Sequence, residues 1–170
     1  MKILYVYDKF PTTYQAYLIE TLGMIKQSLL VKSFAYENSK KADHNIVSYN
    51  FQDRFQRLLY KLKLSKYPSS DIKIMDHYDV IHIQHSYLWR KILPLEKLVN
   101  RPRIIITLRG GDTYIKPWVD ASWLRLYKEK EHLIDAFVVM SQNQKEYLMR
   151  WGVLEHKIYV IPISFGLPSD

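Results

Sequence analysis

The sequence contains no cysteine among its 170 residues. This absence excludes a disulfide framework and any thiolate chemistry, and it fits the reducing conditions of the cytosol. No apolar run approaches the roughly 18 residues that a membrane-spanning helix needs. The opening segment Met1–Asp8 is too short to be a signal peptide and predicts a first strand instead. We therefore expect a cytoplasmic protein.

Three common motifs of nucleotide and hydrolase chemistry are also missing. No Gly-x-Gly-x-x-Gly follows the first predicted strand, so we expect no dinucleotide cofactor. The sequence has neither a Gly-Lys-Ser/Thr phosphate loop nor a Gly-x-Ser-x-Gly elbow, which argues against a P-loop NTPase and against a hydrolase of that type. His82 and His85 are three positions apart on a predicted strand, where they face opposite sides of a sheet. They are poor joint ligands, and we expect no metal site.

The composition suits one domain with a substantial core, because hydrophobic residues make up 48% of the chain. Lysine and arginine outnumber aspartate and glutamate by 25 to 17, which gives a formal net charge of +8. A basic balance indicates an anionic partner such as a nucleic acid, a membrane surface or a phosphorylated substrate. The charge alone does not choose among them.

Apolar strand-like segments alternate with amphipathic helical segments along the whole chain. Strands are predicted at Lys2–Tyr7, Leu29–Tyr36, Asn45–Tyr49, Asp79–Gln84, Arg103–Leu108, Asp135–Met140 and Lys157–Ile161. Helices are predicted at about Thr13–Gln27, Phe51–Ser65, Tyr87–Val99, Trp118–Leu133 and Gln142–Trp151. This order predicts an α/β fold with a Rossmann-like, doubly wound parallel sheet in three α/β/α layers. We assign residues 1–162 to this domain and residues 163–170 to the start of a linker.

The segment Arg103–Asp112 is the most informative of these. Its three isoleucines and a threonine favour a strand, and the lack of alternation predicts a strand covered on both faces. Ligands of a parallel sheet bind beyond the carboxyl ends of the strands, where Gly110 and Gly111 would let a ligand approach bare backbone amides. We predict a binding cleft here that contains Arg109 and Asp112. The other interpretation is a plain turn in which Asp112 makes a local cap.

Two other polar residues follow predicted strands. His85 comes at the end of the strand 79–84 and is a candidate site residue, whereas His82 is expected in the core. Ser141 follows the strand 135–140. It either caps the next helix or contacts an anion at the N-terminus of that helix.

The predicted helix Phe51–Ser65 has a strongly apolar face with a basic flank made of Arg54, Arg57 and Lys61. One interpretation is a helix whose apolar face packs on the sheet while the basic flank is solvated. The other is a helix that also contacts an anionic membrane surface, which would place the protein peripherally on the inner face of a membrane.

Four stretches, taken in order, resemble motifs of the N-terminal domain of family 4 glycosyltransferases, which have the GT-B fold. They are Lys9–Leu18 (KFPTTYQAYL), Tyr78–His85 (YDVIHIQH), Thr107–Asp112 (TLRGGD), and Asp135–Ser141 (DAFVVMS) followed by Gly152, Lys157–Pro162 (KIYVIP) and Gly166. Each motif is weak alone, but their order and spacing are fairly specific. The Glu-x7-Glu motif of the family's second domain has no counterpart here.

The resemblance implies the acceptor-binding half of a nucleotide-sugar-dependent retaining glycosyltransferase, in the synthesis of a bacterial surface polysaccharide or glycolipid. The nucleotide-sugar donor would bind mainly to a C-terminal domain outside this chain, and no cofactor is expected in this domain, which should be inactive alone. The expected partners are a sugar or lipid-linked glycan acceptor, that C-terminal domain and an anionic membrane surface. The residues with implied catalytic roles are Arg109 and Asp112. The residues with implied acceptor contacts are Phe10, Thr12, Thr13, His85, Gly110, Gly111 and Ser141.

One departure from the family pattern bears on the chemistry. The family usually has histidine where this chain has Arg109, and an arginine cannot act as a base. It can, however, bind an anionic acceptor group or a donor phosphate through two hydrogen bonds. The departure keeps open a non-catalytic module that binds a glycan or a lipid headgroup. A basic nucleic-acid-binding domain is a further alternative, but no recognised motif supports it, and we expect no nucleic acid partner.

Overall fold

The protein is described by a computed structural model that covers residues 1–10, 17–37, 39–46 and 51–162. Seven parallel strands form one sheet in the order β3-β2-β1-β4-β5-β6-β7. The strands are β1 (Lys2–Tyr7), β2 (Leu30–Ala35), β3 (His44–Asn45), β4 (Val80–Ile83), β5 (Arg103–Thr107), β6 (Ala136–Val139) and β7 (Ile158–Val160). The sheet confirms the predicted α/β fold class and its parallel strand direction.

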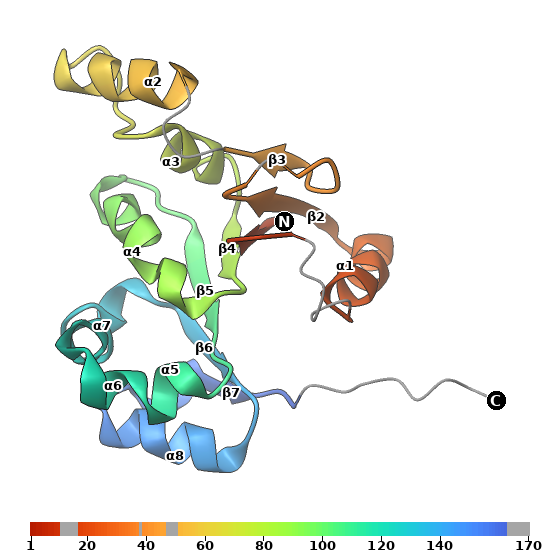
Figure 1. Ribbon diagram of the computed structural model, residues 1–170, viewed down its shortest axis with the longest axis vertical. Helices are drawn as coiled ribbons and strands as arrows, with labels where there is room; N and C mark the ends of the chain where they lie inside the picture. The colour runs from red at the N-terminus through yellow and green to blue at the C-terminus, as the bar shows by residue number, and fades with distance from the viewer. Residues whose placement is uncertain (11–16, 38, 47–50, 163–170) are drawn as a thin grey trace.

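Helices cover both faces of the sheet and give three layers (Figure 1). The helix α1 lies on one face, and α4 and α7 lie on the other (Figure 1). The helices are α1 (Tyr17–Ser28), α2 (Phe51–Lys61), α3 (Ser70–Met75), α4 (Trp89–Ile92), α5 (Gly111–Tyr114), α6 (Lys116–Val119), α7 (Ala121–Glu129) and α8 (Gln142–Arg150). The connections are therefore those of a doubly wound, Rossmann-like domain.

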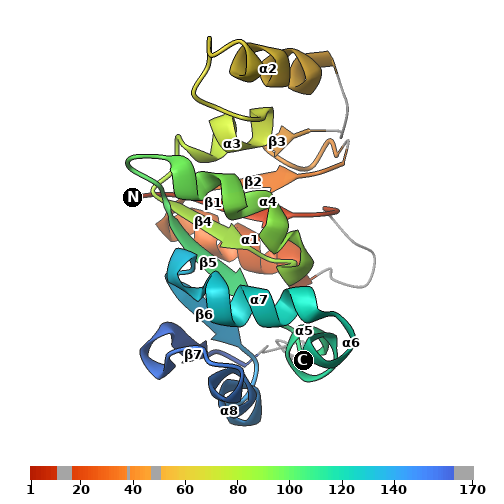
Figure 2. The ribbon, with the colours of Figure 1, turned by 90° about the vertical axis from the view of Figure 1, so that its left-hand side faces the viewer.

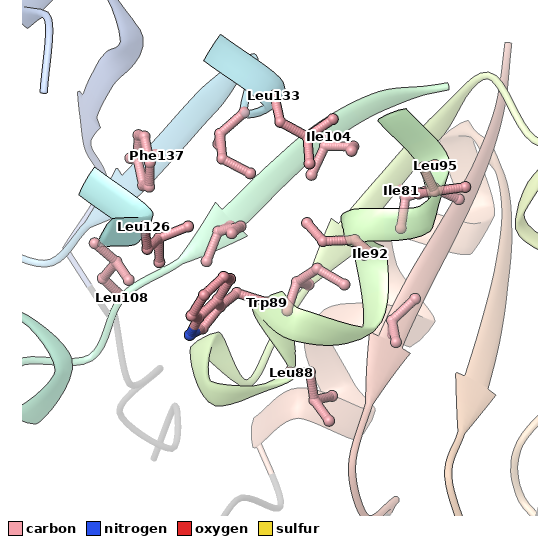
Figure 3. Packing of buried hydrophobic residues seen from close by; sticks show 14 of the residues in the cluster. Ile81, Leu88, Trp89, Ile92, Leu95, Ile104, Leu108, Leu126, Leu133 and Phe137 are labelled. Atoms are coloured by element: carbon pink, nitrogen blue, oxygen red, sulfur yellow. The ribbon is translucent and has the colours of Figure 1, made fainter. Parts of the chain in front are cut away.

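The central strand β5 shows why its sequence does not alternate. Ile104 and Ile106 are completely buried in the larger core cluster, together with Ile92 of α4 and Leu126 of α7 (Figure 3). Ile105 packs against the smaller cluster, which contains Leu18 and Leu22 of α1. Because successive side chains of a strand point to opposite faces, a strand buried on both sides must be apolar at every position.

Two predicted helices are broken into shorter pieces. The segment predicted as Tyr87–Val99 consists of a 3-10 turn, the four-residue α4 and a second 3-10 turn, Leu93–Lys97. Pro94 explains the break, because it lacks the N–H that a continuing helix would need. In the segment predicted as Trp118–Leu133, Asp120 separates α6 from α7 and accepts a hydrogen bond from the Ser122 amide at 2.9 Å.

Two further sequence expectations on the β3 side of the sheet need correction. Within the described residues the third strand is His44–Asn45, and residues 47–49 of its predicted range lie outside them. The helix α3, which begins at Ser70, is not among the helices that the sequence predicts. The motif residues 11–16 and the linker assigned to 163–170 also lie outside the described residues.

The expectation that α2 packs its apolar face on the sheet is wrong. Its buried residues are Asp53 and Gln56, whereas Phe51 and Phe55 are exposed. Helical periodicity identifies which residues share a face but does not specify which face meets the protein. Within the described residues, no helix has the length and apolar character that would be needed to cross a bilayer.

His82, which the sequence places in the core, lies within β4 and is partly buried. Its Nε2 lies 2.8 Å from the Oγ1 of Thr107 on the neighbouring strand, and its ring centroid lies 4.7 Å from that of Tyr5. Burial, with a smaller contribution from the charge of Arg109, lowers the pKa of His82 to about 4. His82 is therefore neutral at pH 7 in the folded protein.

The low pKa of His82 predicts that this residue destabilises the fold as the pH falls. The unfolded chain binds a proton at His82 near pH 6.5, but the folded protein does so only near pH 4. The contribution of neutral His82 to the unfolding free energy is complete above pH 6.5 and is lost as the pH falls from 6.5 to 4. Relative to His82→Gln, the native protein should lose about 2 kcal/mol of unfolding free energy between pH 7 and pH 5, measured by urea denaturation. The matched control is His156→Gln, at an exposed position, and its unfolding free energy should vary with pH as that of the native protein does. If the unfolding free energy of His82→Gln also varied with pH in this way, the low pKa assigned to His82 would be wrong.

Candidate functional site

The candidate site lies at the carboxyl edge of the sheet, where β4 and β5 end side by side. Residues Gln84–Tyr87 follow β4, and residues Arg109–Asp112 follow β5. The two segments border a cleft of about 260 Å³. The cleft is lined by Gln84, His85, Ser86, Tyr87, Arg109, Gly111, Asp112, Lys116 and Trp123. A hollow therefore lies at the strand ends where the sequence predicts a binding cleft, and ligand binding there stays a prediction.

Asp112 holds the loop after β5 in place. Its carboxylate accepts hydrogen bonds from the backbone amides of Arg109 at 3.1 Å and Gly110 at 3.0 Å, and from the hydroxyl of Ser86. Asp112 is only 8% exposed. These contacts show the local cap that the sequence offered as one interpretation. They also link the loop after β5 to the segment after β4.

The guanidinium of Arg109 is anchored to the end of β4. Its Nε donates to the carbonyl oxygen of Gln84 at 3.3 Å, and one terminal nitrogen donates to the Gln84 side-chain oxygen at 3.2 Å. An arginine keeps its positive charge throughout the range in which proteins are folded. Arg109 therefore supplies a fixed cation at the border of the cleft, with Lys116 as a second cation on the lining.

His85 connects the cleft to the end of β1. Its Nδ1 accepts the backbone N–H of Asp8 at 3.1 Å, so a neutral His85 carries its proton on Nε2. Burial lowers the pKa of His85, the charge of Arg109 lowers it further, and Asp8 opposes both. The ring of Tyr87 stacks on His85 with centroids 5.6 Å apart.

The sequence reasoning missed Tyr87, which lines the cleft, and Asp8, which is bonded to His85 and Tyr87 of the lining. The Tyr87 hydroxyl donates to the Asp8 carboxylate at 3.1 Å, and burial and this carboxylate raise the pKa of Tyr87. Asp8 follows β1 directly, so the rule that located Arg109 could have found it. Tyr87 lies further from its strand, and no sequence signal distinguishes it from a helix residue.

Two other predicted site residues, Phe10 and Ser141, lie elsewhere. Phe10 is 3% exposed, packs against Tyr7 with ring centroids 4.5 Å apart, and does not line the cleft. Ser141 caps α8 by accepting the Gln144 amide at 3.2 Å and does not line the cleft either. Thr12 and Thr13 lie outside the described residues. Acceptor contact by these four residues stays a prediction.

A larger hollow, of about 570 Å³, lies at the opposite edge of the sheet beside Lys2, Leu30 and Tyr78. We place the site in the smaller cleft, because the strands deliver their polar carboxyl-end residues there and not to the larger hollow. Across the described part of the chain, no group of three histidine, aspartate or glutamate residues is arranged to hold a metal ion.

The two glycines of the loop after β5 should respond differently to substitution. Gly110 has φ +112°, which a residue with a side chain rarely adopts, whereas Gly111 begins α5 without a positive φ. An added Cβ would be 3.8 Å from Tyr114 at position 110 and would meet nothing within 4 Å at position 111. Gly110→Ala should therefore lower the unfolding free energy by about 1–3 kcal/mol through backbone strain alone. The matched change Gly111→Ala should shift it by less than about 1 kcal/mol. Urea denaturation checks both, and equal losses would contradict the assigned backbone conformation.

The domain has the fold of several solved proteins. It is similar to Anabaena Alr3699/HepE in complex with UDP-glucose, with a TM-score of 0.67 and 14% identity over 97% of this chain and 44% of that chain. It is also similar to UDP-GlcNAc 2-epimerase from Methanocaldococcus jannaschii, with a TM-score of 0.56 and 15% identity over 94% of this chain and 45% of that chain. The lipopolysaccharide outer core galactosyltransferase WaaB, in its apo form, gives a TM-score of 0.50 and 14% identity over 95% of this chain and 45% of that chain. The chain thus spans less than half the length of each.

No curated protein matches the sequence. The family model for Glycosyltransferase Family 4, however, matches residues 29–163, which include β2 to β7 and the whole candidate cleft. This match confirms the resemblance seen in the sequence motifs. The chain therefore belongs to glycosyltransferase family 4.

Proposed function

We propose that this domain is the acceptor-binding half of a retaining, nucleotide-sugar-dependent glycosyltransferase that builds a bacterial surface polysaccharide or glycolipid. The acceptor, a sugar or a lipid-linked glycan, binds in the cleft at the carboxyl edge of the sheet. The donor binds mainly to a C-terminal domain that faces this cleft. The observation that carries the proposal is the Arg109 guanidinium, which is held by Gln84 at the border of that cleft.

The anchored guanidinium suits a reaction in which negative charge develops on a leaving phosphate. In sugar transfer, the acceptor oxygen forms a bond to the anomeric carbon while the bond from that carbon to the donor phosphate breaks. The acceptor proton passes to the departing phosphate. Hydrogen-bonding groups of the protein that are already in position stabilise such charge more strongly than water does, because they need not reorganise during the reaction. The guanidinium of Arg109 can act as such a hydrogen-bonding group, but it cannot accept the proton of the acceptor hydroxyl.

The remaining residues of the cleft position the reactants. Asp112 fixes the loop that carries Arg109, so we assign it a positioning role. His85 is neutral and is held beside Tyr87 at the cleft by its bond to the Asp8 amide, so we assign it a positioning role as well. Alignment of two reactants can supply a large part of the rate enhancement in a transfer reaction.

Two structural relatives support a nucleotide-sugar donor. HepE has been solved in complex with UDP-glucose, and the epimerase is named for UDP-GlcNAc. Both matches cover less than half of those proteins, so a donor of this class is part of the proposal for the full-length protein.

The proposal predicts that sugar transfer by the full-length protein depends on the guanidinium of Arg109. Arg109→Met should reduce turnover by about 100-fold to 1,000-fold, because it removes a charged hydrogen-bonding group from the phosphate on which negative charge develops. Arg109→Lys should reduce it by about tenfold, because the charge remains but the planar pair of donors is lost. Turnover is measured as UDP release from UDP-glucose, UDP-galactose or UDP-N-acetylglucosamine in the presence of a membrane glycolipid extract.

The matched control is Arg125→Met, at an exposed position of α7 that does not line the cleft. It should keep full turnover, and circular dichroism should show native folding for all three variants. Full turnover by Arg109→Met would show that Arg109 has no role in the reaction. Glycan binding by a native protein that transfers none of these sugars would favour the non-catalytic module, for which the replacement of histidine by Arg109 is the supporting observation.

A further inference from the structure

The helix α2 is attached to the protein by its polar side chains. The Asp53 carboxylate accepts the Arg57 Nε at 2.8 Å and the backbone N–H of Ser70 at 3.1 Å. The Gln56 side-chain nitrogen donates to the Ser65 hydroxyl at 2.7 Å and to the Tyr67 carbonyl at 2.8 Å. Asp53 and Gln56 are 4% and 7% exposed. These contacts fix which face of α2 points away from the protein.

The outward face of α2 is apolar. Phe51 is 83% exposed, and Phe55, Leu58 and Leu62 are each more than half exposed. Leu62 continues the helical turn, because its N–H donates to the Leu58 carbonyl at 3.0 Å. These residues follow one another at spacings of three and four, so they share a single face. A cluster of large apolar side chains in water is unfavourable and marks a surface that is covered in the functional state.

Basic residues border this apolar face. Between positions 51 and 66 the sequence has five cations, of which Arg57 pairs with the buried Asp53 and Lys66 pairs with Asp76. The others are Arg54, Lys61 and Lys63. A helix with an apolar face and a basic border is the form that binds in the interface of an anionic bilayer, where apolar side chains insert and cations meet lipid headgroups. A second copy of the same helix would bring like charges together.

The position of α2 leaves room for a large planar partner. In both ribbon views α2 lies beyond α3 at one end of the molecule, away from β5, β6 and β7 (Figures 1 and 2). We propose that α2 docks this domain on an anionic lipid bilayer, with the face formed by Phe51, Phe55, Leu58 and Leu62 inserted among the acyl chains. This docking does not depend on sugar transfer, and it leaves the cleft at the end of β5 open.

Vesicle binding by the full-length protein tests this proposal. The probes are phosphatidylcholine vesicles with and without 30% phosphatidylglycerol, in low and in high salt. The native protein should bind the anionic vesicles at least tenfold more tightly, and high salt should weaken this binding. The combined change Phe51→Ser, Phe55→Ser, Leu58→Ser and Leu62→Ser should reduce the binding at least tenfold.

The pair Arg54→Glu and Lys61→Glu should reduce the binding by a similar factor. Each variant has a control with equal changes at exposed positions elsewhere. The apolar control changes Met24, Leu30, Val99 and Leu154 to Ser, and the charge control changes Lys97 and Lys128 to Glu. Both controls should keep native binding within twofold. Because the changed residues of α2 point into solvent, circular dichroism should show native folding throughout.

Three outcomes would overturn the proposal. The first is equal binding to neutral and anionic vesicles, and the second is native binding by the serine variant. The third is no vesicle binding by a native protein whose sedimentation shows a dimer that the serine changes disrupt, which would assign the face to a second copy of the chain. None of these readouts uses catalysis, so loss of the Arg109-dependent turnover and loss of membrane docking are distinguishable.

Discussion

Burial of β5 on both faces is the constraint on which the rest of this structure depends. The isoleucines of β5 need an apolar layer above and another below, and the helices supply both. Only crossover connections can place helices on the two faces of a parallel sheet, and such connections align all strand ends. The cleft is a consequence of this alignment, because the polar residues that follow β1, β4 and β5 arrive at the same edge.

Hydrogen bonds between adjacent loops then give the cleft a defined shape. Two links join the segment after β4 to the loop after β5: the contact of Arg109 with Gln84, and the contact of Asp112 with Ser86. A third link joins His85 to the end of β1. Arg109 and His85 influence each other electrostatically, since the cation disfavours protonation of the imidazole. The site therefore combines a fixed cation with a neutral hydrogen-bond donor, and both are held by the main chain.

The strands could be predicted from sequence because β-branched apolar runs bounded by glycine, proline and polar residues have few alternatives to a buried strand. The placement of Arg109, Asp112 and His85 at one edge followed from that prediction alone. The breaks in the helices around α4 and α6 were harder to predict. A proline or a capping aspartate ends a helix within one turn, whereas hydrophobic periodicity is recognised only over several turns. Phe10 also follows β1, but it packs against Tyr7 and does not line the cleft, so position after a strand alone does not place a side chain in the site. The contact between Tyr87 and Asp8 depends on residues 79 positions apart, which no local pattern encodes.

The orientation of α2 was unpredictable for a different reason. Its sequence defines an apolar face and a basic flank, and both packing on the sheet and contact with a membrane are compatible with that pattern. The buried contacts of Asp53 and Gln56 exclude packing of the apolar face on the sheet, and they involve residues on the connection from α2 to α3 and on α3 itself. Tertiary contacts of polar side chains thus determine what an amphipathic helix presents to solvent.

The strand order also has a consequence for synthesis on the ribosome. The first strand made, β1, lies in the middle of the sheet, and its neighbour β4 is the fourth. Lys2 at the start of β1 donates its backbone N–H to Asp79, which is 77 residues later in the chain. At translation rates of 5–20 residues per second, β1 waits roughly 4–15 s for this neighbour. During that interval the edge of β1 that later pairs with β4 is unpaired, and an unpaired apolar strand edge favours aggregation.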